Sequence, residues 1–282
     1  DLKKLTAYST VSHLGWIVAT IGVGTPFAIG AALVHTLAHA LFKSSLFMLI
    51  GVIDHEAGSR DIRRLGPLWN KMPWTFGSVV IGAASMAAVP PLLGFVSKEG
   101  MLTAFEDAPI GGAGQAILLI VAGIGAFFTF TYSAKIVFGA FFDGPRSMDD
   151  VHEAPVSLWL PAALPGFMSL PLVFVLGIFE KPLEHAVGAV GMETHAHLSL
   201  WHGINVPFII SILVLVAGIA GIFVRKKMWP AFEERNFMPR SGNELLQSLQ
   251  DGCAKLGQVL GKMSDSHNPV SYTHLRAHET GR

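Results

Sequence analysis

One apolar run, from residue 27 to residue 53, carries three ionisable side chains at a spacing of four: His35, His39 and Lys43. A step of four residues turns an α-helical side chain by only about 40°, so the three groups lie along one stripe of roughly 12 Å. A bilayer core needs about 20 apolar residues to cross, so the run is long enough to span it. The pattern therefore predicts a membrane helix with ionisable groups near mid-membrane.

Ionisable groups at that depth are costly and face a bundle interior or a hydrated path. The alternative interpretation is a pair of packed core histidines and a lysine that reaches the membrane interface. Lys43, however, is about ten residues from the nearer end of the run, beyond the reach of its stem. The stripe therefore favours a functional path.

Composition places the whole chain in the membrane class. Its 282 residues are 51% hydrophobic and 14% charged, with a mean hydropathy of +0.50, which is too apolar for an ordinary soluble domain. The formal net charge is zero, so no nucleic-acid partner is indicated. The single cysteine, Cys253, excludes an intrachain disulfide framework and an iron–sulfur site. No cofactor or metal is predicted.

Hydropathy predicts spans over residues 8–24, 28–53, 74–92, 114–142, 156–179 and 203–224. A seventh, interrupted segment is expected over 90–106, because prolines and a glycine there precede a polar trio: Pro90, Pro91, Gly94, Ser97, Lys98 and Glu99. Broken helices occur at membrane depth where protein or water satisfies the freed backbone groups, so this segment is expected to line a cavity. The alternative is a plain loop between two spans.

Two signals for membrane orientation conflict. Arg225, Lys226 and Lys227 follow the last predicted span and indicate a cytoplasmic end there. If residues 90–106 cross fully, seven crossings put the basic loop at residues 54–72 on the opposite side. We expect the full crossing.

Beyond the last span, residues 243–263 have an amphipathic helical pattern, with apolar residues such as Leu249 and Leu256 on one side. This segment is expected to lie on the membrane or to dock on neighbouring subunits. The chain begins without methionine, and residues 270–282 have no helical or strand pattern. We expect the chain to be a fragment and this tail to be non-native, so His274 and His278 are not counted as ligands.

A proton or cation relay through lipid needs groups that exchange protons near neutral pH and lie close enough for water to bridge them. His35, His39 and Lys43 fit this requirement. Lys98 in the broken segment would be a second switchable charge, with Glu99 as its counter-ion. The alternative for Lys98 is a lysine that reaches the interface.

Other candidates are weaker. His13 lies among hydroxyl residues in the first span and is either a relay member or a packing histidine. Lys4 is either an interfacial anchor or a supplier of the polar path, and Lys135 is expected to reach the membrane surface near Asp143. The polar stretch near residue 195 is expected to be an exposed loop rather than a metal site, although it holds Glu193, His195, His197 and His202.

Three blocks, DLKKLTAYSTVSHLGW, HTLAHALFKSSLFMLIG and PPLLGFVSKEGML, resemble the antiporter-like subunits shared by respiratory complex I and the multisubunit Mrp/Mnh cation/proton antiporters. They cover roughly the first half of the chain in the family's order. IDHEAGSRDIRRLGPL is most similar to the large A-type subunit of the Mrp antiporter. The resemblance implies an all-α transmembrane bundle, here mostly the second inverted repeat with one discontinuous helix, and an amphipathic surface helix after it.

The resemblance also implies site residues. The family's central hydrophilic axis corresponds to His35, His39 and Lys43, and the lysine of its second broken helix corresponds to Lys98. His13 stands where relatives often carry glutamine. The expected organisation is an antiporter-like domain at 1–180, a loop and further span at 181–228, a linker and lateral helix at 229–269, and the tail.

The predicted function is Na⁺/H⁺ exchange by a multi-pass membrane subunit, without enzymatic chemistry, in the bacterial inner membrane. Its expected partners are other subunits, Na⁺, H⁺ and the lipid bilayer. One alternative is a proton-pumping subunit of complex I, which neighbouring genes would separate. The other is a scaffold that does not transport, against which the mid-membrane ionisable groups count, because a scaffold has no need of them.

Overall fold

The computed structural model is all-helical over the residues it describes, which are 1–145, 147–192, 203–234 and 242–264. Contacts divide the chain into one unit of residues 1–225 and a second of residues 226–282. In chain order the elements are α1 (Leu2–Gly22), α2 (Pro26–Ala57), α3 (Pro73–Met86), α4 (Leu93–Glu106), α5 (Gly112–Phe141), α6 (Val156–Met168), α7 (Pro171–Phe174), the 3₁₀ helix η1 (Leu176–Phe179), α8 (Glu180–Gly188), α9 (Val206–Glu234) and α10 (Gly242–Ser264).

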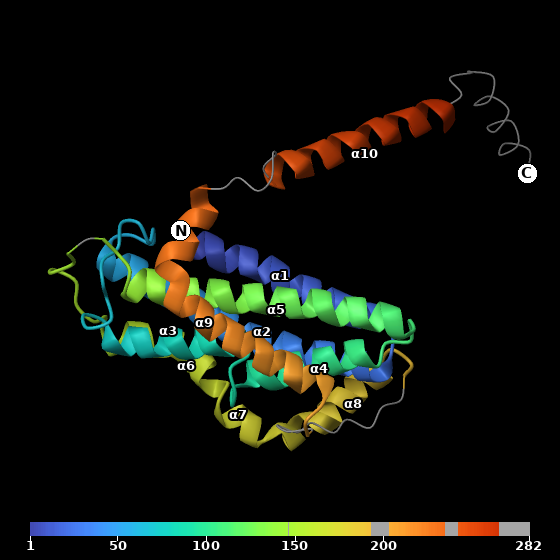
Figure 1. The fold of residues 1–282 in the computed structure, drawn as a ribbon, viewed down its shortest axis with the longest axis horizontal. Helices are drawn as coiled ribbons and strands as arrows, with labels where there is room; N and C mark the ends of the chain where they lie inside the picture. The colour runs from blue at the N-terminus through green and yellow to red at the C-terminus, as the bar shows by residue number, and fades with distance from the viewer. Residues whose placement is uncertain (146, 193–202, 235–241, 265–282) are drawn as a thin grey trace, which may run out of the picture. The chain divides into compact units, whose positions relative to one another are not determined.

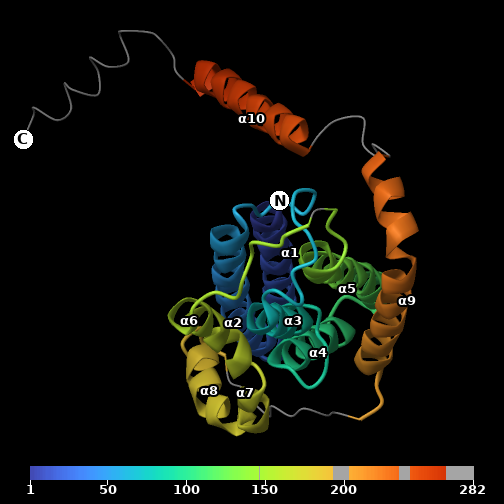
Figure 2. The same cartoon turned by 90° about the vertical axis from the view of Figure 1, so that its left-hand side faces the viewer.

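Helix α2 is the centre of the first unit and packs against α1, α3, α4 and α6 (Figure 1). It begins where the Thr25 hydroxyl accepts a hydrogen bond from the Ala28 N–H and Pro26 occupies the first turn, both common helix starts. It ends at Gly58, whose φ of 65° suits glycine at a helix C-terminus. Figure 2 shows α1 and α2 side by side with α3 and α4 across them.

Four helical segments are long and apolar enough to cross a membrane among the described residues: Pro26–Ala57, Gly112–Phe141, Val156–Phe174 and Val206–Lys227. The span predicted at 8–24 is a helix, α1, but it is not among these four. Its buried face explains this result, because that face carries polar side chains (Thr6, Ser9, His13 and Thr20). The span predicted at 156–179 is interrupted, since α6 ends at Met168 and short turns follow.

The interruption predicted near Pro90 lies between α3 and α4. Helix α3 ends at Met86, short of the predicted end at residue 92, and α4 resumes at Leu93. Each half has 14 residues, or about 21 Å of axis, which is too short for a hydrocarbon core of about 30 Å. The expectation that 90–106 crosses by itself is therefore wrong, and α3 and α4 together make one crossing.

Two serines close the gap between the half-helices. The Ser85 and Ser169 hydroxyls are 2.8 Å apart, and Ser169 Oγ accepts from the Leu93 N–H at 3.0 Å. Ser85 Oγ lies 3.3 Å from the Gly94 nitrogen, which donates to it. Donors freed by the break thus find partners inside the protein, as backbone groups at membrane depth must.

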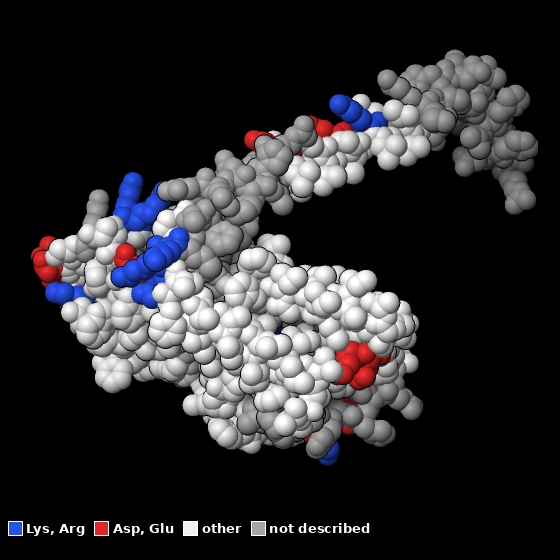
Figure 3. Space-filling model, in the orientation of Figure 1, with Lys and Arg blue, Asp and Glu red and all other residues white. Residues whose placement is uncertain are grey.

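The corrected crossing also removes the conflict in orientation. The Trp69 N–H donates to the Phe141 carbonyl at 3.3 Å, so the loop after α2 lies at the end of α5. Arg225 of α9 pairs with Asp143 at 2.8 Å, just beyond the same end. Basic side chains of the loop and of Arg225 therefore share one end of the first unit, where Lys and Arg gather in Figure 3, and the two orientation signals agree.

The second unit contains α10, which is helical over the segment predicted to be amphipathic. Its leucines, including Leu249 and Leu256, are exposed, as is Cys253. The tail at residues 270–282 lies outside the described residues.

Gly94 is the position where the break tolerates no side chain. A Cβ there would lie 1.7 Å from the Ser85 carbonyl oxygen, whereas a Cβ at Gly100 in the same helix would meet only the Ala31 Cβ at 3.7 Å. We expect Gly94→Ala to lower the stability of the purified complex by about 1–3 kcal/mol, measured by thermal melting. Gly100→Ala should be neutral or stabilising. Equal melting temperatures for the two variants would contradict this account of the break.

Candidate functional site

The site lies where α1, α2 and α4 meet. The buried face of α1 carries Thr6, Ser9 and His13 at helical spacing, and α1 packs on α2. Helix α2 presents His35 and Lys43, both buried, and α4 presents Ser97, Lys98 and Glu99, also buried. Three helices that are separate in sequence thus bring polar side chains into one interior region.

A chain of hydrogen-bond contacts joins the three helices. His13 Nδ1 is 3.0 Å from His35 Nε2, and His35 Nδ1 is 2.9 Å from Ser97 Oγ. Ser97 Oγ can donate to the Gly94 carbonyl at 3.1 Å. Each imidazole has one donor and one acceptor nitrogen when neutral, so the line can shift a proton by exchanging tautomers.

Lys43 is anchored on α1, toward the α1 N-terminus from His13. Its Nζ donates to the Thr6 carbonyl at 3.0 Å and is hydrogen-bonded to the Ser9 hydroxyl. Ser9 Oγ also donates to the Thr6 carbonyl at 2.8 Å. A lysine held by such neutral oxygens can gain and lose a proton without breaking an ion pair, which suits a switchable charge.

His39 is half-buried rather than fully enclosed, and its ring centroid lies 5.4 Å from that of His13. Within the described part of the chain, its Nε2 is buried without a hydrogen-bond partner, as is His13 Nε2. Phe42 is fully buried, and its ring centroid lies 5.2 Å from that of His13 and 5.5 Å from that of His39. The histidines therefore form one cluster with an aromatic wall.

Lys98 and Glu99 sit on the other side of this cluster. Lys98 is 4% exposed and Glu99 3%. Lys98 Nζ has no hydrogen-bond partner among the described residues and lies 5.3 Å from the centroid of the Trp16 ring. Buried polar groups are normally paired, so an unpaired amine marks a place where water or a proton carrier is accommodated.

Ion pairs seen in the described part of the chain lie at the helix ends rather than in this cluster. Arg60 pairs with Asp1 at 3.0 Å, and Arg225 with Asp143. In the loop after α2, hydrogen bonds from Arg63 hold the pKa of Asp61 below its ordinary value. The basic groups of the buried cluster are thus set apart from these pairs, which leaves their charge responsive to protons.

Other predicted residues are placed elsewhere. Lys4 is exposed in the first turn of α1, where its backbone N–H donates to Asp1, so the structure does not bring it into the cluster. Lys135 is half-buried on α5. The stretch with a metal-like composition falls within residues 193–202, outside the described residues.

Some residues of the cluster carry no sequence prediction. Ser97 and Thr6 act as partners of His35 and Lys43, and Trp16 faces Lys98. The spacing of Thr6, Ser9 and His13 indicates a polar face on α1. The partners across helices have no signal within a single segment, because their positions are far apart in the chain.

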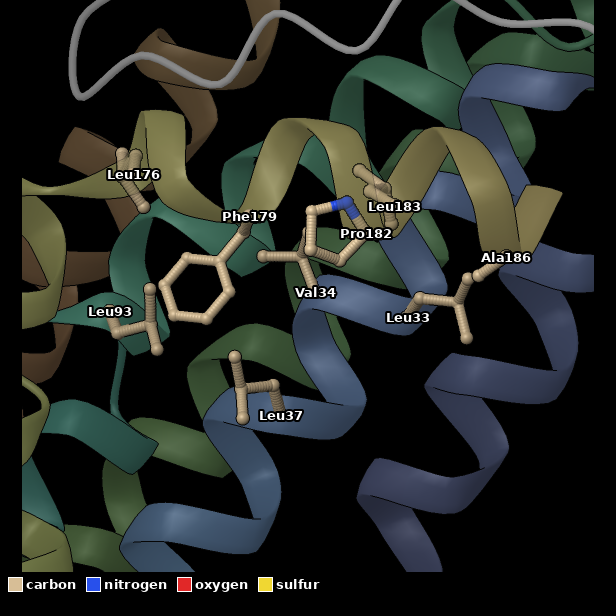
Figure 4. A pocket seen from close by; sticks show the side chains of 9 residues that line it. All are labelled: Leu33, Val34, Leu37, Leu93, Leu176, Phe179, Pro182, Leu183 and Ala186. Atoms are coloured by element: carbon tan, nitrogen blue, oxygen red, sulfur yellow. The ribbon is translucent and has the colours of Figure 1, made fainter. Parts of the chain in front are cut away.

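A separate cavity of about 180 Å³ borders the same helix α2. Leu33, Val34 and Leu37 contribute from α2, and Phe179 and Leu183 approach from η1 and α8 (Figure 4). All of its lining residues are apolar, and apolar cavities stay dry. This cavity therefore does not extend the polar cluster to the surface.

Ser97 supplies the link between α2 and α4. We expect Ser97→Ala to leave His35 Nδ1 without its partner and to cost about 1–3 kcal/mol of stability, since a buried polar atom would be left unsatisfied. Ser133→Ala is the matched control, because this buried hydroxyl donates to the Thr129 carbonyl of its own helix. Thermal melting of the purified complex measures both, and an equal effect would contradict the link.

Comparison with known proteins shows where this architecture recurs. Residues 1–129 match the family model described as NADH:quinone oxidoreductase/Mrp antiporter, transmembrane. The A/B-type subunit of the K⁺/H⁺ antiporter of Rhizobium meliloti, named as probable, is 39% identical over 80% of this chain and 23% of its own length. The A-type subunit of the Na⁺/H⁺ antiporter of Alkalihalophilus pseudofirmus is 38% identical, over 81% and 32% respectively.

Solved structures agree. The Mrp complex of Dietzia sp. DQ12-45-1b contains a chain that is 40% identical, with a TM-score of 0.79 over 98% of this chain and 30% of that one. An archaeal membrane-bound sulfane sulfur reductase shares the fold, at 20% identity and a TM-score of 0.57 over 98% of this chain and 51% of that one. The chain spans about a quarter to a third of the length of the antiporter relatives. With this sequence match and this all-helical fold, the chain belongs to the NADH:quinone oxidoreductase/Mrp antiporter transmembrane family and is similar to the A-type subunits of Mrp/Mnh antiporters.

Proposed function

We propose that this chain is part of a membrane subunit that exchanges a monovalent cation, Na⁺ in our interpretation, for protons. The observation that carries the proposal is the buried cluster in which His13, His35 and Ser97 form one hydrogen-bonded line with Lys43 and Lys98 at its sides. Relatives named as A-type subunits of Na⁺/H⁺ antiporters support exchange as the reaction.

In this proposal Lys43 holds a proton against Thr6 and Ser9 and passes it to the histidines through water. The His13–His35–Ser97 line carries the proton across from α1 to α4 by exchange of tautomers. Lys98 receives the proton at the other side, with Glu99 as its neighbouring counter-charge. His39, half-buried beside His13, supplies a further proton-binding site.

The assembly and location follow from the relatives. We infer that the protein works with other antiporter subunits in a bacterial inner membrane, and that the segment after residue 228 is a lateral helix contacting the bilayer or a neighbour. A proton-pumping subunit of a complex I-like enzyme is the second candidate, because the matching family model includes both classes. A scaffold function is disfavoured, because it does not require buried, unpaired basic groups.

Arginine substitution tests whether Lys43 and Lys98 must lose a proton. Guanidinium stays charged at any working pH, so Lys43→Arg and Lys98→Arg should abolish Na⁺-dependent proton movement in everted vesicles that hold the complete complex. Lys→Ala at either position should do the same.

Lys4 provides the matched control, since it is exposed and outside the cluster. Lys4→Arg and Lys4→Ala should exchange at the wild-type rate, with complex assembly checked by blue-native electrophoresis. Wild-type exchange by Lys43→Arg and Lys98→Arg complexes would show that neither amine needs to release a proton, and the scaffold interpretation would then be preferred.

A further inference from the structure

Lys98 has an aromatic partner where a carboxylate or hydroxyl would be expected. Its Nζ makes no hydrogen bond to the described residues and lies 5.3 Å from the centroid of the Trp16 ring. An ammonium group within about 6 Å of an indole is attracted by the negative face of the ring, most strongly where water is absent. Trp16 is therefore placed to stabilise one protonation state of Lys98 over the other.

The ring of Trp16 is held in position from two sides. It stacks on Phe105 of α4, with centroids 5.8 Å apart and an angle of 29° between the planes. Gly125 of α5 lies against its other atoms, since a Cβ at Gly125 would be 3.5 Å from the indole. Trp16 is only 9% exposed, so its orientation toward Lys98 is set by packing and not by chance contact with lipid.

We propose that Trp16 is a positioning residue for Lys98, whose indole face holds the ammonium group in the buried cluster and favours its charged form. This inference rests on the proposed function of Lys98 as a switchable charge. It assigns to α1 a second contribution besides His13. It also explains why Lys98 needs no ion pair in order to keep a proton for part of the cycle.

Other titratable groups around Lys98 must be separated from this effect. Helices α3 and α7 have no ionisable side chain, so these groups come from the other helices of the cluster and from α5. They are His13 on α1, His35, His39 and Lys43 on α2, Glu99 on α4, and Tyr132 and Lys135 further along α5. None of these groups changes in a Trp16 variant, so a shift in pH dependence reports on the ring.

The test compares Trp16→Leu with Trp16→Phe in the complete complex, by measuring Na⁺-dependent proton movement in everted vesicles over a range of pH. Loss of the aromatic face should move the alkaline limit of exchange to lower pH by about half a unit to one unit. Trp16→Phe should shift it less, because phenylalanine binds cations more weakly than tryptophan does. Trp159→Leu, at a stacked tryptophan pair with Trp74, should leave the limit unchanged.

Two results would overturn the inference. One is a wild-type pH limit in Trp16→Leu, and the other is an equal loss of rate in Trp16→Leu and Trp16→Phe without a shift. If Trp16→Leu fails to assemble, Trp16→Phe decides alone, and an unshifted limit in that variant rejects the proposal. Exchange by Lys98→Arg would reject the proposed function of Lys98 itself. Loss of exchange there, with an unshifted Trp16→Leu, rejects only the function of Trp16.

Discussion

Burial of basic side chains without carboxylate partners is the constraint on which the described part of the first unit depends. A charged or polar group inside an apolar bundle must find hydrogen-bond partners or water, or it destabilises the fold. Here the partners come from helix α1, whose buried face is polar, and from the hydroxyl of Ser97 on α4. Apolar residues that face outward on α5 and α9 complete a bundle that is polar inside and apolar outside, the reverse of a soluble one.

The break between α3 and α4 places the polar groups of α4. Ser85 and Ser169 satisfy the donors that the break frees, and Gly94 allows α4 to approach the Ser85 backbone. Ser97 lies one turn beyond Gly94, so this close approach sets the distance between Ser97 and His35. A continuous helix would put the same residues at another depth and rotation. The discontinuity is therefore part of the geometry of the site and not a defect of the span.

Helical periodicity is enough to predict that α2 is continuous and carries His35 and Lys43 on a buried face, because both depend on local spacing. It does not distinguish His39, which is only half-buried, since successive steps of four drift around the helix. Hydropathy predicts the interruption but counts one crossing too many. Two halves of 14 residues share a single crossing, and that fact depends on where the ends of α2, α5 and α9 meet.

Partners across helices cannot be read from the sequence. The pairs His13–His35 and Lys43–Thr6 join residues 22 and 37 positions apart, and His35–Ser97 joins residues 62 apart. Such pairs depend on how the helices rotate about their axes, which packing decides. The same reason hides Trp16, since an aromatic residue on a membrane helix has many ordinary explanations until the position of Lys98 is known.

A cryo-electron microscopy map of the complete complex, at a resolution that shows ordered water, tests the central claim most directly. The account predicts an unbroken series of hydrogen-bond distances, below about 3.5 Å, from Lys43 through His13, His35 and Ser97 to Lys98, with water filling the steps that protein atoms leave open. A dry gap closed by Phe42, or rings of His13 and His35 too far apart to share a proton, would contradict it.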